Sequence, residues 1–326
     1  MSLRTAAPAR PLRVASHLAP SVLPAYALVA RRVGEALSRP AELVVAADYR
    51  RCVDDVDDIC FVCSIPYLLL SDAGRIGMTP LAAPVLLAAR HGDRPVYDSE
   101  AIVRTDSPYR SLADLNGSRW AYNEPFSHSG FVTALHQLAA SGHDSTFIGE
   151  WIETGFHDDA IHAVLDGHAD WAAVDSQVLD LWRGWHPALR QQLRTVAVLG
   201  PSTIQPVVAS TTRLTVAERT AVTETLLTIH EDPMARRVLG ACGIRRFIAI
   251  EASAYDDIRR MLARVDDAGL LPDWWWPRWE RITATSRSIS RRSPERARSR
   301  LEGTKASRCR RPPPRRSSPP PSRPPS

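Results

Sequence analysis

Residues Asn123–Leu138 read NEPFSHSGFVTALHQL, and a turn rich in small and polar residues passes there directly into apolar residues at helical spacing. The first turn of a helix has unpaired N–H groups and the positive end of the helix dipole, so it suits an oxyanion. Ser127 and Ser129 add hydroxyl donors, and Gly130 allows a ligand to approach the backbone closely. Serine there also caps a helix without any ligand, and on this stretch alone capping is the favoured interpretation.

Around this stretch, strand-like and helix-like segments alternate, which is typical of an α/β fold. Strands are predicted over residues 12–16, 41–47, 58–64, 83–90, 99–108, 118–125, 146–153, 169–176 and 193–210. Helices are predicted over residues 26–37, around Tyr49, over 157–167 and through most of the last third before the tail. A lobe built from both sequence ends, with a middle segment inserted as a second lobe, would make a hinged cleft.

The charge of the chain is concentrated at its C-terminal end. The 326 residues carry a net charge of +5, but residues 287–326 hold 12 Arg, one Lys and two Glu, a net +11, which leaves −6 for the rest. That Pro-, Arg- and Ser-rich tail has almost no large apolar residues, so disorder is expected there. The whole chain is 44% hydrophobic and long enough for two packed domains or one large one, and no specific nucleic-acid partner is expected.

Several kinds of site and segment are not expected from the sequence. The N-terminal residues lack an apolar run of signal-peptide length, and no stretch reaches the roughly 18 apolar residues of a membrane span. The five cysteines are scattered, and Cys60 and Cys63 of the CFVC run have no second ligand pair, so buried thiols are favoured over a metal. No phosphate-loop or dinucleotide fingerprint occurs, so no cofactor is predicted.

Three runs together resemble a known family: residues 96–130, the run GFHDDAIHAVLDGHADWAAVDS at 155–176, and residues 199–233. They resemble the phosphate/phosphonate-binding proteins of ABC importers, over roughly residues 12–269. The resemblance implies a two-lobed type 2 periplasmic binding-protein fold. The expected division is lobe 1 from residues 1–98 and 199–286, an inserted lobe 2 from residues 99–198, and a tail from residues 287–326.

The resemblance also implies where the ligand would bind. In the family a serine-rich loop at a helix start grips the phosphonate, a histidine and an acidic or amide residue follow later strands, and tyrosines face the ligand. The positions that match here are Tyr49, Ser64, Tyr67, Tyr97, Ser127, His128, Ser129, Gly130, His157 and Asp175. His128 stands where the family usually has Thr. Capping remains an alternative role for His157 and Asp175, and packing is one for Tyr49 and Tyr97.

The expected function is the binding of a small oxyanion, a phosphonate or a related phosphorus compound, by a monomer that serves an ABC permease. As the sequence stands it predicts a cytoplasmic protein, whereas a start further upstream would allow export. The alternative is a cytosolic enzyme on the same fold, similar to some menaquinone-pathway enzymes and acting on a small carboxylate. A Ser–His–Asp hydrolase is disfavoured because FSHSG lacks the leading Gly of a nucleophile elbow.

Residues Asp273–Arg281 read DWWWPRWER, with four tryptophans in six positions. Such a cluster could dock on a partner or on a bilayer surface. Packing against the first lobe, where the globular part of the chain ends, is the favoured interpretation.

Overall fold

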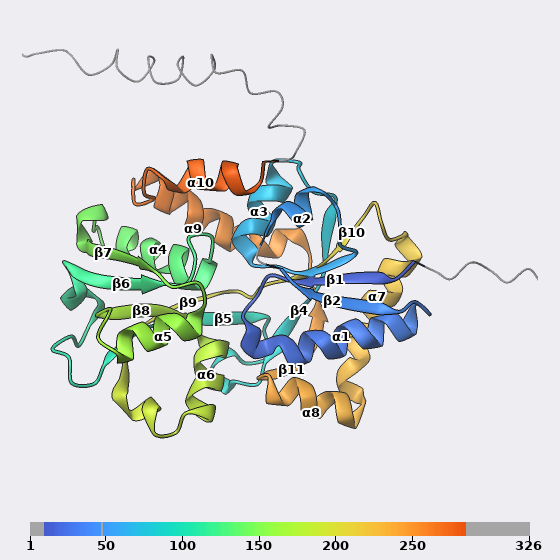
Figure 1. Ribbon diagram of the computed structural model, residues 1–326, viewed down its shortest axis with the longest axis horizontal. Coiled ribbons are helices and arrows are strands. Elements are labelled where there is room, and N and C mark those ends of the chain that lie inside the picture. Colours follow the sequence, from blue (N-terminus) through green and yellow to red (C-terminus); the bar gives the residue numbers. More distant parts are fainter. Residues whose placement is uncertain (1–9, 47, 285–326) are drawn as a thin grey trace, which may run out of the picture. The chain divides into compact units, whose positions relative to one another are not determined.

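The computed structural model describes residues 10–46 and 48–284. The tail predicted over residues 287–326 lies outside the described residues, as does Cys309. The described chain is an α/β fold with two separate β-sheets (Figure 1), so the predicted fold class is confirmed.

The first sheet combines strands from the beginning and the later part of the chain, in the order β11-β4-β10-β3-β1-β2. Its strands are β1 (Leu12–Ser16), β2 (Ala41–Val45), β3 (Ile59–Phe61), β4 (Met78–Leu86), β10 (Val207–Ser210) and β11 (Ile244–Ala249). β1 pairs in parallel with both β2 and β3, whereas β10 runs antiparallel between β3 and β4. The carboxyl ends of β1 and β3 therefore meet at one edge of this sheet.

The second sheet is built from the middle of the chain, in the order β7-β6-β8-β5-β9. Its strands are β5 (Val96–Arg104), β6 (Ser118–Tyr122), β7 (Ile148–Glu153), β8 (Trp171–Asp175) and β9 (Leu193–Thr203). β6 is parallel to β7 and β8, whereas β5 lies antiparallel between β8 and β9. The chain enters this sheet from β4 into β5 and leaves it from β9 into β10.

Helices surround both sheets (Figure 1). The α-helices are α1 (Leu23–Ala36), α2 (Arg50–Val53), α3 (Ser64–Asp72), α4 (Thr133–Ala140), α5 (His157–Leu165), α6 (Ser176–Trp185), α7 (Val216–Thr228), α8 (Pro233–Ala241), α9 (Asp256–Asp267) and α10 (Trp275–Ile282). A π-helical turn, η4 (His128–Val132), leads directly into α4. The 3₁₀ turns are η1 (Pro20–Val22), η2 (Ala89–His91), η3 (Leu112–Leu115), η5 (Ser145–Phe147), η6 (Leu189–Gln192), η7 (Ile229–Glu231) and η8 (Ala252–Tyr255). No helix among the described residues is both long enough and apolar enough to cross a membrane.

Several predicted strands differ in extent from the observed ones. The strand predicted over residues 83–90 corresponds to β4, which begins earlier, at Met78, and ends at Leu86. Two other differences have a local cause. The strand predicted over residues 58–64 ends at Phe61, because the chain turns into α3 at Ser64. The extended segment 193–210 divides into β9 and β10 around Pro206, whose nitrogen cannot donate a ladder hydrogen bond.

Aromatic side chains fill much of the core of the second sheet. Trp120 of β6 stacks on Trp171 of β8, with ring centroids 5.0 Å apart and planes 8° from parallel. Phe131 of η4 also stacks on Trp120, with ring centroids 5.3 Å apart. Phe131 therefore holds the turn after β6 against the sheet. This contact fixes the position of the serine loop, Ser127–Gly130.

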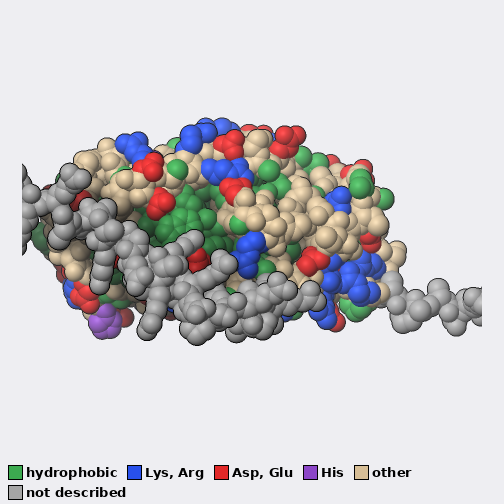
Figure 2. Space-filling model, turned by 90° about the horizontal axis from the view of Figure 1, so that it is seen from above, with side chains coloured by type: hydrophobic (Ala, Val, Ile, Leu, Met, Phe, Trp, Pro, Cys, Tyr) green, Lys and Arg blue, Asp and Glu red, His purple; other side chains and the backbone are tan. Residues whose placement is uncertain are grey.

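The tryptophan-rich segment forms α10, and its faces differ in exposure. Trp275 and Trp279 are buried, whereas Trp274 and Trp276 are 37% and 39% exposed. Trp275 donates its indole N–H to the carbonyl of Pro125 at 2.6 Å, so the buried tryptophans pack against the segment that carries the serine loop. Figure 2 views the molecule from the α10 side and shows hydrophobic side chains interspersed with both basic and acidic ones.

Candidate functional site

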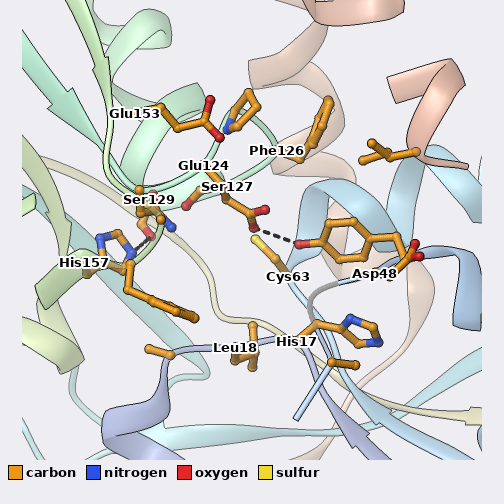
Figure 3. A pocket seen from close by; sticks show the side chains of 18 of the residues that line it. His17, Leu18, Asp48, Cys63, Glu124, Phe126, Ser127, Ser129, Glu153 and His157 are labelled. Carbon is orange, nitrogen blue, oxygen red and sulfur yellow. Dashed lines mark hydrogen bonds between the residues drawn. The ribbon is translucent and has the colours of Figure 1, made fainter. Parts of the chain in front are cut away.

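A cavity of about 600 Å³ lies between the loops of the first sheet and the serine loop of the second (Figure 3). Loops at the first sheet contribute His17, Tyr49 and Cys63, and those at the second contribute Ser127 and Ser129. His157 and Asp175 line the same cavity. Of the ten residues predicted at the site, the structure thus places five on this cavity, namely Tyr49, Ser127, Ser129, His157 and Asp175.

Four helix starts converge on the cavity. Cys63 is the N-cap residue of α3, Ser127 of the η4–α4 helix and Asp175 of α6, and His157 is the first residue of α5. All four residues line the cavity, so the amino ends of their helices are directed toward it. Each helix start contributes a positive dipole end, although cap residues already accept some of the first N–H groups. The cavity is therefore suited to an anion, and Arg50, Arg278 and Arg281 also line it.

The two serines of the loop have different roles. Ser127 accepts a hydrogen bond from the N–H of Gly130 at 3.0 Å, so it caps the helix as the sequence alone suggested. The Ser129 hydroxyl lies 3.2 Å from His157 Nε2, within hydrogen-bonding distance. Burial lowers the pKa of His157 to about 4, so its imidazole is neutral at pH 7. Ser129 and His157 together form a neutral hydrogen-bonding pair on the cavity wall.

Gly130 and His128 lie behind the loop and do not line the cavity. A Cβ atom at Gly130 would lie 1.8 Å from Asn123 Oδ1 and 3.0 Å from His157 Cε1, so glycine is required there by protein neighbours. His128 is fully buried, and its Nε2 lies 3.2 Å from Thr133 Oγ1. Burial lowers the pKa of His128 to about 3, so this ring is neutral as well.

Asp175 both caps α6 and lines the cavity. Its Oδ1 accepts the N–H groups of Gln177 and Val178 at 2.7 and 3.3 Å, and its Oδ2 accepts the Gln205 amide at 3.1 Å. Burial raises the pKa of Asp175 to about 6, despite these hydrogen bonds. The capping role that the sequence allowed is therefore observed, and the carboxylate still lines the cavity.

Glu124 is a cavity residue that the sequence analysis did not identify. The Tyr49 hydroxyl donates a hydrogen bond to Glu124 Oε1 at 2.7 Å (Figure 3). Burial raises the pKa of Glu124, and the same burial together with the Glu124 charge raises that of Tyr49. Glu124 lies within the quoted stretch, three residues before the first serine, but its role depends on Tyr49, the N-cap residue of α2 beside the first sheet. No local sequence signal distinguishes it from an exposed loop acid.

Three arginines lie at the rim of the cavity, and two of them are paired with acidic groups. Arg278 of α10 forms two hydrogen bonds with Glu153, at 2.5 and 2.6 Å. Arg50 pairs with Asp48 at 2.7 Å. Arg281, in the last turn of α10, is exposed and also lines the cavity.

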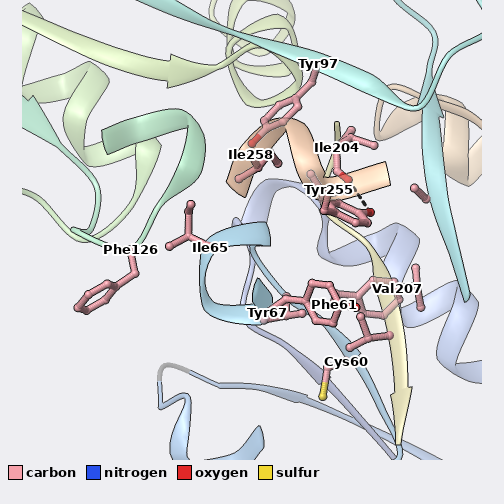
Figure 4. Close-up of a cluster of buried hydrophobic side chains, with 14 of the residues drawn as sticks. Cys60, Phe61, Ile65, Tyr67, Tyr97, Phe126, Ile204, Val207, Tyr255 and Ile258 are labelled. Atoms are coloured by element: carbon pink, nitrogen blue, oxygen red, sulfur yellow. Dashed lines mark hydrogen bonds between the residues drawn. The ribbon is translucent and has the colours of Figure 1, made fainter. Parts of the chain in front are cut away.

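The remaining predicted residues lie in the core or at a helix start. Ser64 is the buried first residue of α3, so it lies in a helix and not in a loop. Tyr67, one turn along the same helix, packs edge-to-face on Tyr255 with ring centroids 5.8 Å apart. Tyr97 is fully buried and lies 6.1 Å from the His128 ring. Figure 4 shows Tyr67 and Tyr97 among buried hydrophobic side chains, which is the packing alternative for Tyr97.

Solved structures of binding proteins share this fold. A binding protein component of an ABC phosphonate transporter from Pseudomonas aeruginosa matches with a TM-score of 0.69 and 15% identity, over 92% of this chain and 99% of that one. PhnD1 from Prochlorococcus marinus, solved with methylphosphonate, also has a TM-score of 0.69, with 16% identity over 78% and 98% of the two chains. The alkanesulfonate-binding protein SsuA from Xanthomonas axonopodis pv. citri, bound to MOPS, has a TM-score of 0.56, with 18% identity over 82% and 96%.

These likenesses confirm the type 2 periplasmic binding-protein fold that the resemblance implied. A search of the curated proteins found no match. The family of periplasmic substrate-binding proteins of ABC phosphonate transporters matches residues 13–255, which is most of the sequence. The chain therefore belongs to the family of ABC-transporter phosphonate substrate-binding proteins.

Proposed function

We propose that the cavity binds a phosphonate whose anionic group lies against the serine loop. The observation that carries this proposal is the convergence of four helix starts on one cavity that also presents Ser129 and His157. Helix N–H groups and neutral hydroxyl and imidazole donors stabilise a tetrahedral oxyanion without a full counter-ion. A cavity of about 600 Å³ is large enough for a small organic phosphonate.

The charges around the cavity favour a phosphonate that also has an amino group. Glu153 and Asp48 are paired with arginines at the rim, whereas neither Glu124 nor Asp175 has an ion pair with Arg or Lys among the described residues. Burial raises the pKa of both Glu124 and Asp175, so an ammonium group placed near them would stabilise their charged forms. We therefore place the amine of the ligand near Glu124, with Asp175 as a second acidic neighbour.

Binding without chemistry is supported by the environment of His157. In a Ser–His–Asp triad the carboxylate accepts a hydrogen bond from the second nitrogen of the imidazole. Here Asp175 accepts from Gln177, Val178 and Gln205, and His157 Nδ1 has no hydrogen-bond partner among the described residues. Ser129 and His157 thus form a pair without an orienting carboxylate, which argues against a Ser–His–Asp hydrolase.

The family assigns such proteins to an ABC transporter and to the periplasm. We propose accordingly that this chain delivers its ligand to a permease from outside the cytoplasm. We also propose that the predicted lobes, residues 1–98 with 199–286 and residues 99–198, close on the ligand. A ligand that contacts both lobes stabilises the closed form.

Isothermal titration calorimetry of the full chain tests the ligand class. The probes are 2-aminoethylphosphonate, methylphosphonate, phosphate, propanesulfonate and benzoate. The two phosphonates should bind, and the aminated one should bind more tightly by about tenfold, as expected for one added charged hydrogen bond. A response to benzoate alone would favour the enzyme alternative, and a response to propanesulfonate alone would replace phosphonate by sulfonate.

The variant Glu124→Gln tests whether Glu124 binds the amino group of the ligand and not its phosphonate group. It should weaken the binding of 2-aminoethylphosphonate and change the dissociation constant of methylphosphonate by less than about threefold, because only the first ligand has an ammonium group. Equal losses for both ligands would contradict the proposed place of the amine while leaving the phosphonate assignment intact.

A further inference from the structure

Three potential metal ligands meet at the wall of the cavity, and one of them, His17, lines it. His17 follows β1, Cys52 lies in α2, and Cys60 lies in β3. Their ligand atoms, one imidazole nitrogen and two sulfurs, all lie within 4.8 Å of one another. The fold itself brings them together, because β1 and β3 pair in parallel and the His17 N–H donates to the Phe61 carbonyl at 2.8 Å.

The separation of two of these atoms suits a tetrahedral ion. His17 Nε2 lies 3.6 Å from Cys52 Sγ. Ordinary zinc bonds of about 2.0 Å to nitrogen and about 2.3 Å to sulfur, at a tetrahedral angle, place the two atoms roughly 3.5 Å apart. The observed separation therefore needs almost no rearrangement to hold a metal between imidazole and thiolate.

We propose that His17, Cys52 and Cys60 bind a zinc ion, independently of the phosphonate ligand. Two thiolates and a neutral imidazole around Zn²⁺ give a site with no net charge. Neutrality matters because Cys52 and Cys60 are 2% and 0% exposed, and a net charge there would be costly. His17 also lines the cavity, which gives the ion a path of entry from solvent.

Only one of the two cysteines in the CFVC run, Cys60, belongs to the proposed zinc site. Cys60 faces Cys52 and His17, whereas Cys63 lies after the end of β3, where its sulfur accepts the N–H of His128 at 3.4 Å. The two cysteines thus take part in different contacts. Cys60 and Cys63 have the sequence spacing of a metal-binding pair, but they do not form the proposed site together. The second sulfur ligand is Cys52.

The site would also stabilise one wall of the ligand cavity. The His17 ring stacks on the Tyr49 ring, with centroids 5.2 Å apart and planes 20° from parallel. Tyr49 in turn donates its hydroxyl to Glu124. A metal bound to His17 would fix that imidazole and, through it, the position of the tyrosine.

Cobalt substitution tests the proposal. The full chain is prepared with Cys309→Ser, so that the thiol of the tail cannot compete, and is reduced and titrated anaerobically with Co²⁺ and then with Zn²⁺. One equivalent of cobalt should produce thiolate-to-cobalt charge-transfer absorption and visible tetrahedral bands, and one equivalent of zinc should abolish both. Zinc should also raise the melting temperature, since it binds the folded chain.

Matched variants locate the ligands. Cys52→Ser with Cys60→Ser should abolish the charge-transfer band, whereas Cys63→Ser with Cys242→Ser, two other buried thiols, should keep it. His17→Gln, at a partly exposed position, should weaken zinc by at least tenfold, and it keeps the test decisive if the double cysteine variant does not fold.

Two outcomes would overturn the proposal. Cobalt bands of equal intensity in the Cys52→Ser/Cys60→Ser variant would place the metal elsewhere. A chain that takes up no metal, or that is isolated 2 Da lighter with Cys52 and Cys60 joined and protected from alkylation, would show that the cluster is a pair of plain thiols or a disulfide.

Discussion

Tyr49 and Glu124, 75 positions apart in the chain, are joined by a hydrogen bond of 2.7 Å from the phenol to the carboxylate. Tyr49 caps α2 beside the first sheet, and Glu124 follows β6 of the second. The bond therefore connects the two sides of the cavity directly. It also holds a half-buried acid in place beside the serine loop.

Tyr49→Phe should lower the free energy of unfolding by about 1–3 kcal/mol, because the half-buried Glu124 carboxylate loses its hydrogen-bond donor. Chemical denaturation of the variant and the wild type measures this difference. Tyr109→Phe, at a partly exposed tyrosine away from the cavity, is the control and should change the value by less than about 0.5 kcal/mol. A Tyr49→Phe chain as stable as the wild type would mean that water replaces the phenol at no cost.

Gly130→Ala tests the close packing behind the serine loop. The added Cβ would lie 1.8 Å from Asn123 Oδ1, so the amide must move, and a loss of about 1–3 kcal/mol in stability is expected. Gly184→Ala is the matched control, because Gly184 lies in α6 with nothing within 4 Å of an added Cβ. That variant should be equal to the wild type or more stable by up to about 1 kcal/mol. Similar melting temperatures for the two variants would contradict the steric role of Gly130.

Much of the fold could be predicted because local patterns determine it. Predicted and observed bounds agree closely for β1, Leu12–Ser16, and for the start of α5 at His157, where apolar spacing and a polar first turn mark the element. The serine loop was also found from its local composition, and Ser127 is the helix cap that this composition suggested.

The rest of the site depends on contacts between distant segments. Tyr67 and Tyr97 are tyrosines like Tyr49, and only tertiary packing decides that Tyr49 lines the cavity while the other two lie in the core. Glu124 gains its place from Tyr49 in the same way. Residue type and spacing therefore indicate candidate site residues. Which of them line the cavity depends on the pairing of the strands and on the positions of α2 and α3.

The charge of Asp175 should make stability depend on pH. Its pKa is about 6 in the folded chain against 3.8 as the ordinary value, so between about pH 4 and pH 6 the folded state holds a proton that the unfolded state has lost. Stability contributed by this proton is complete below about pH 4 and is lost as the pH rises through 6. The two-unit shift corresponds to roughly 3 kcal/mol.

Asp175→Asn keeps a side-chain oxygen for the helix cap and removes the titration, so the variant should gain stability relative to the wild type as the pH rises from 4 to 6. Unfolding measured at half-unit pH steps shows this difference. Asp106→Asn is the control: pairing with Arg104 lowers the pKa of that exposed carboxyl, so its effect on stability falls below about pH 4 and its difference from the wild type should stay nearly constant from pH 4 to 6. A constant difference between Asp175→Asn and the wild type would show that Asp175 is already ionised at pH 4.

Single substitutions in the serine loop separate capping from ligand binding. Ser127→Ala removes the cap on Gly130 and should lower stability by about 1 kcal/mol, whereas Ser129→Ala leaves the cap intact. Ser129→Ala should weaken the binding of methylphosphonate by about 10- to 100-fold, since one hydroxyl donor to the anion is lost and His157 loses its hydrogen-bonding partner. Changing both serines should remove most of the affinity while the chain still folds. Calorimetric titration of the three variants, with thermal melts on the same samples, distinguishes these effects, and undiminished binding in the double variant would reduce the loop to a helix cap.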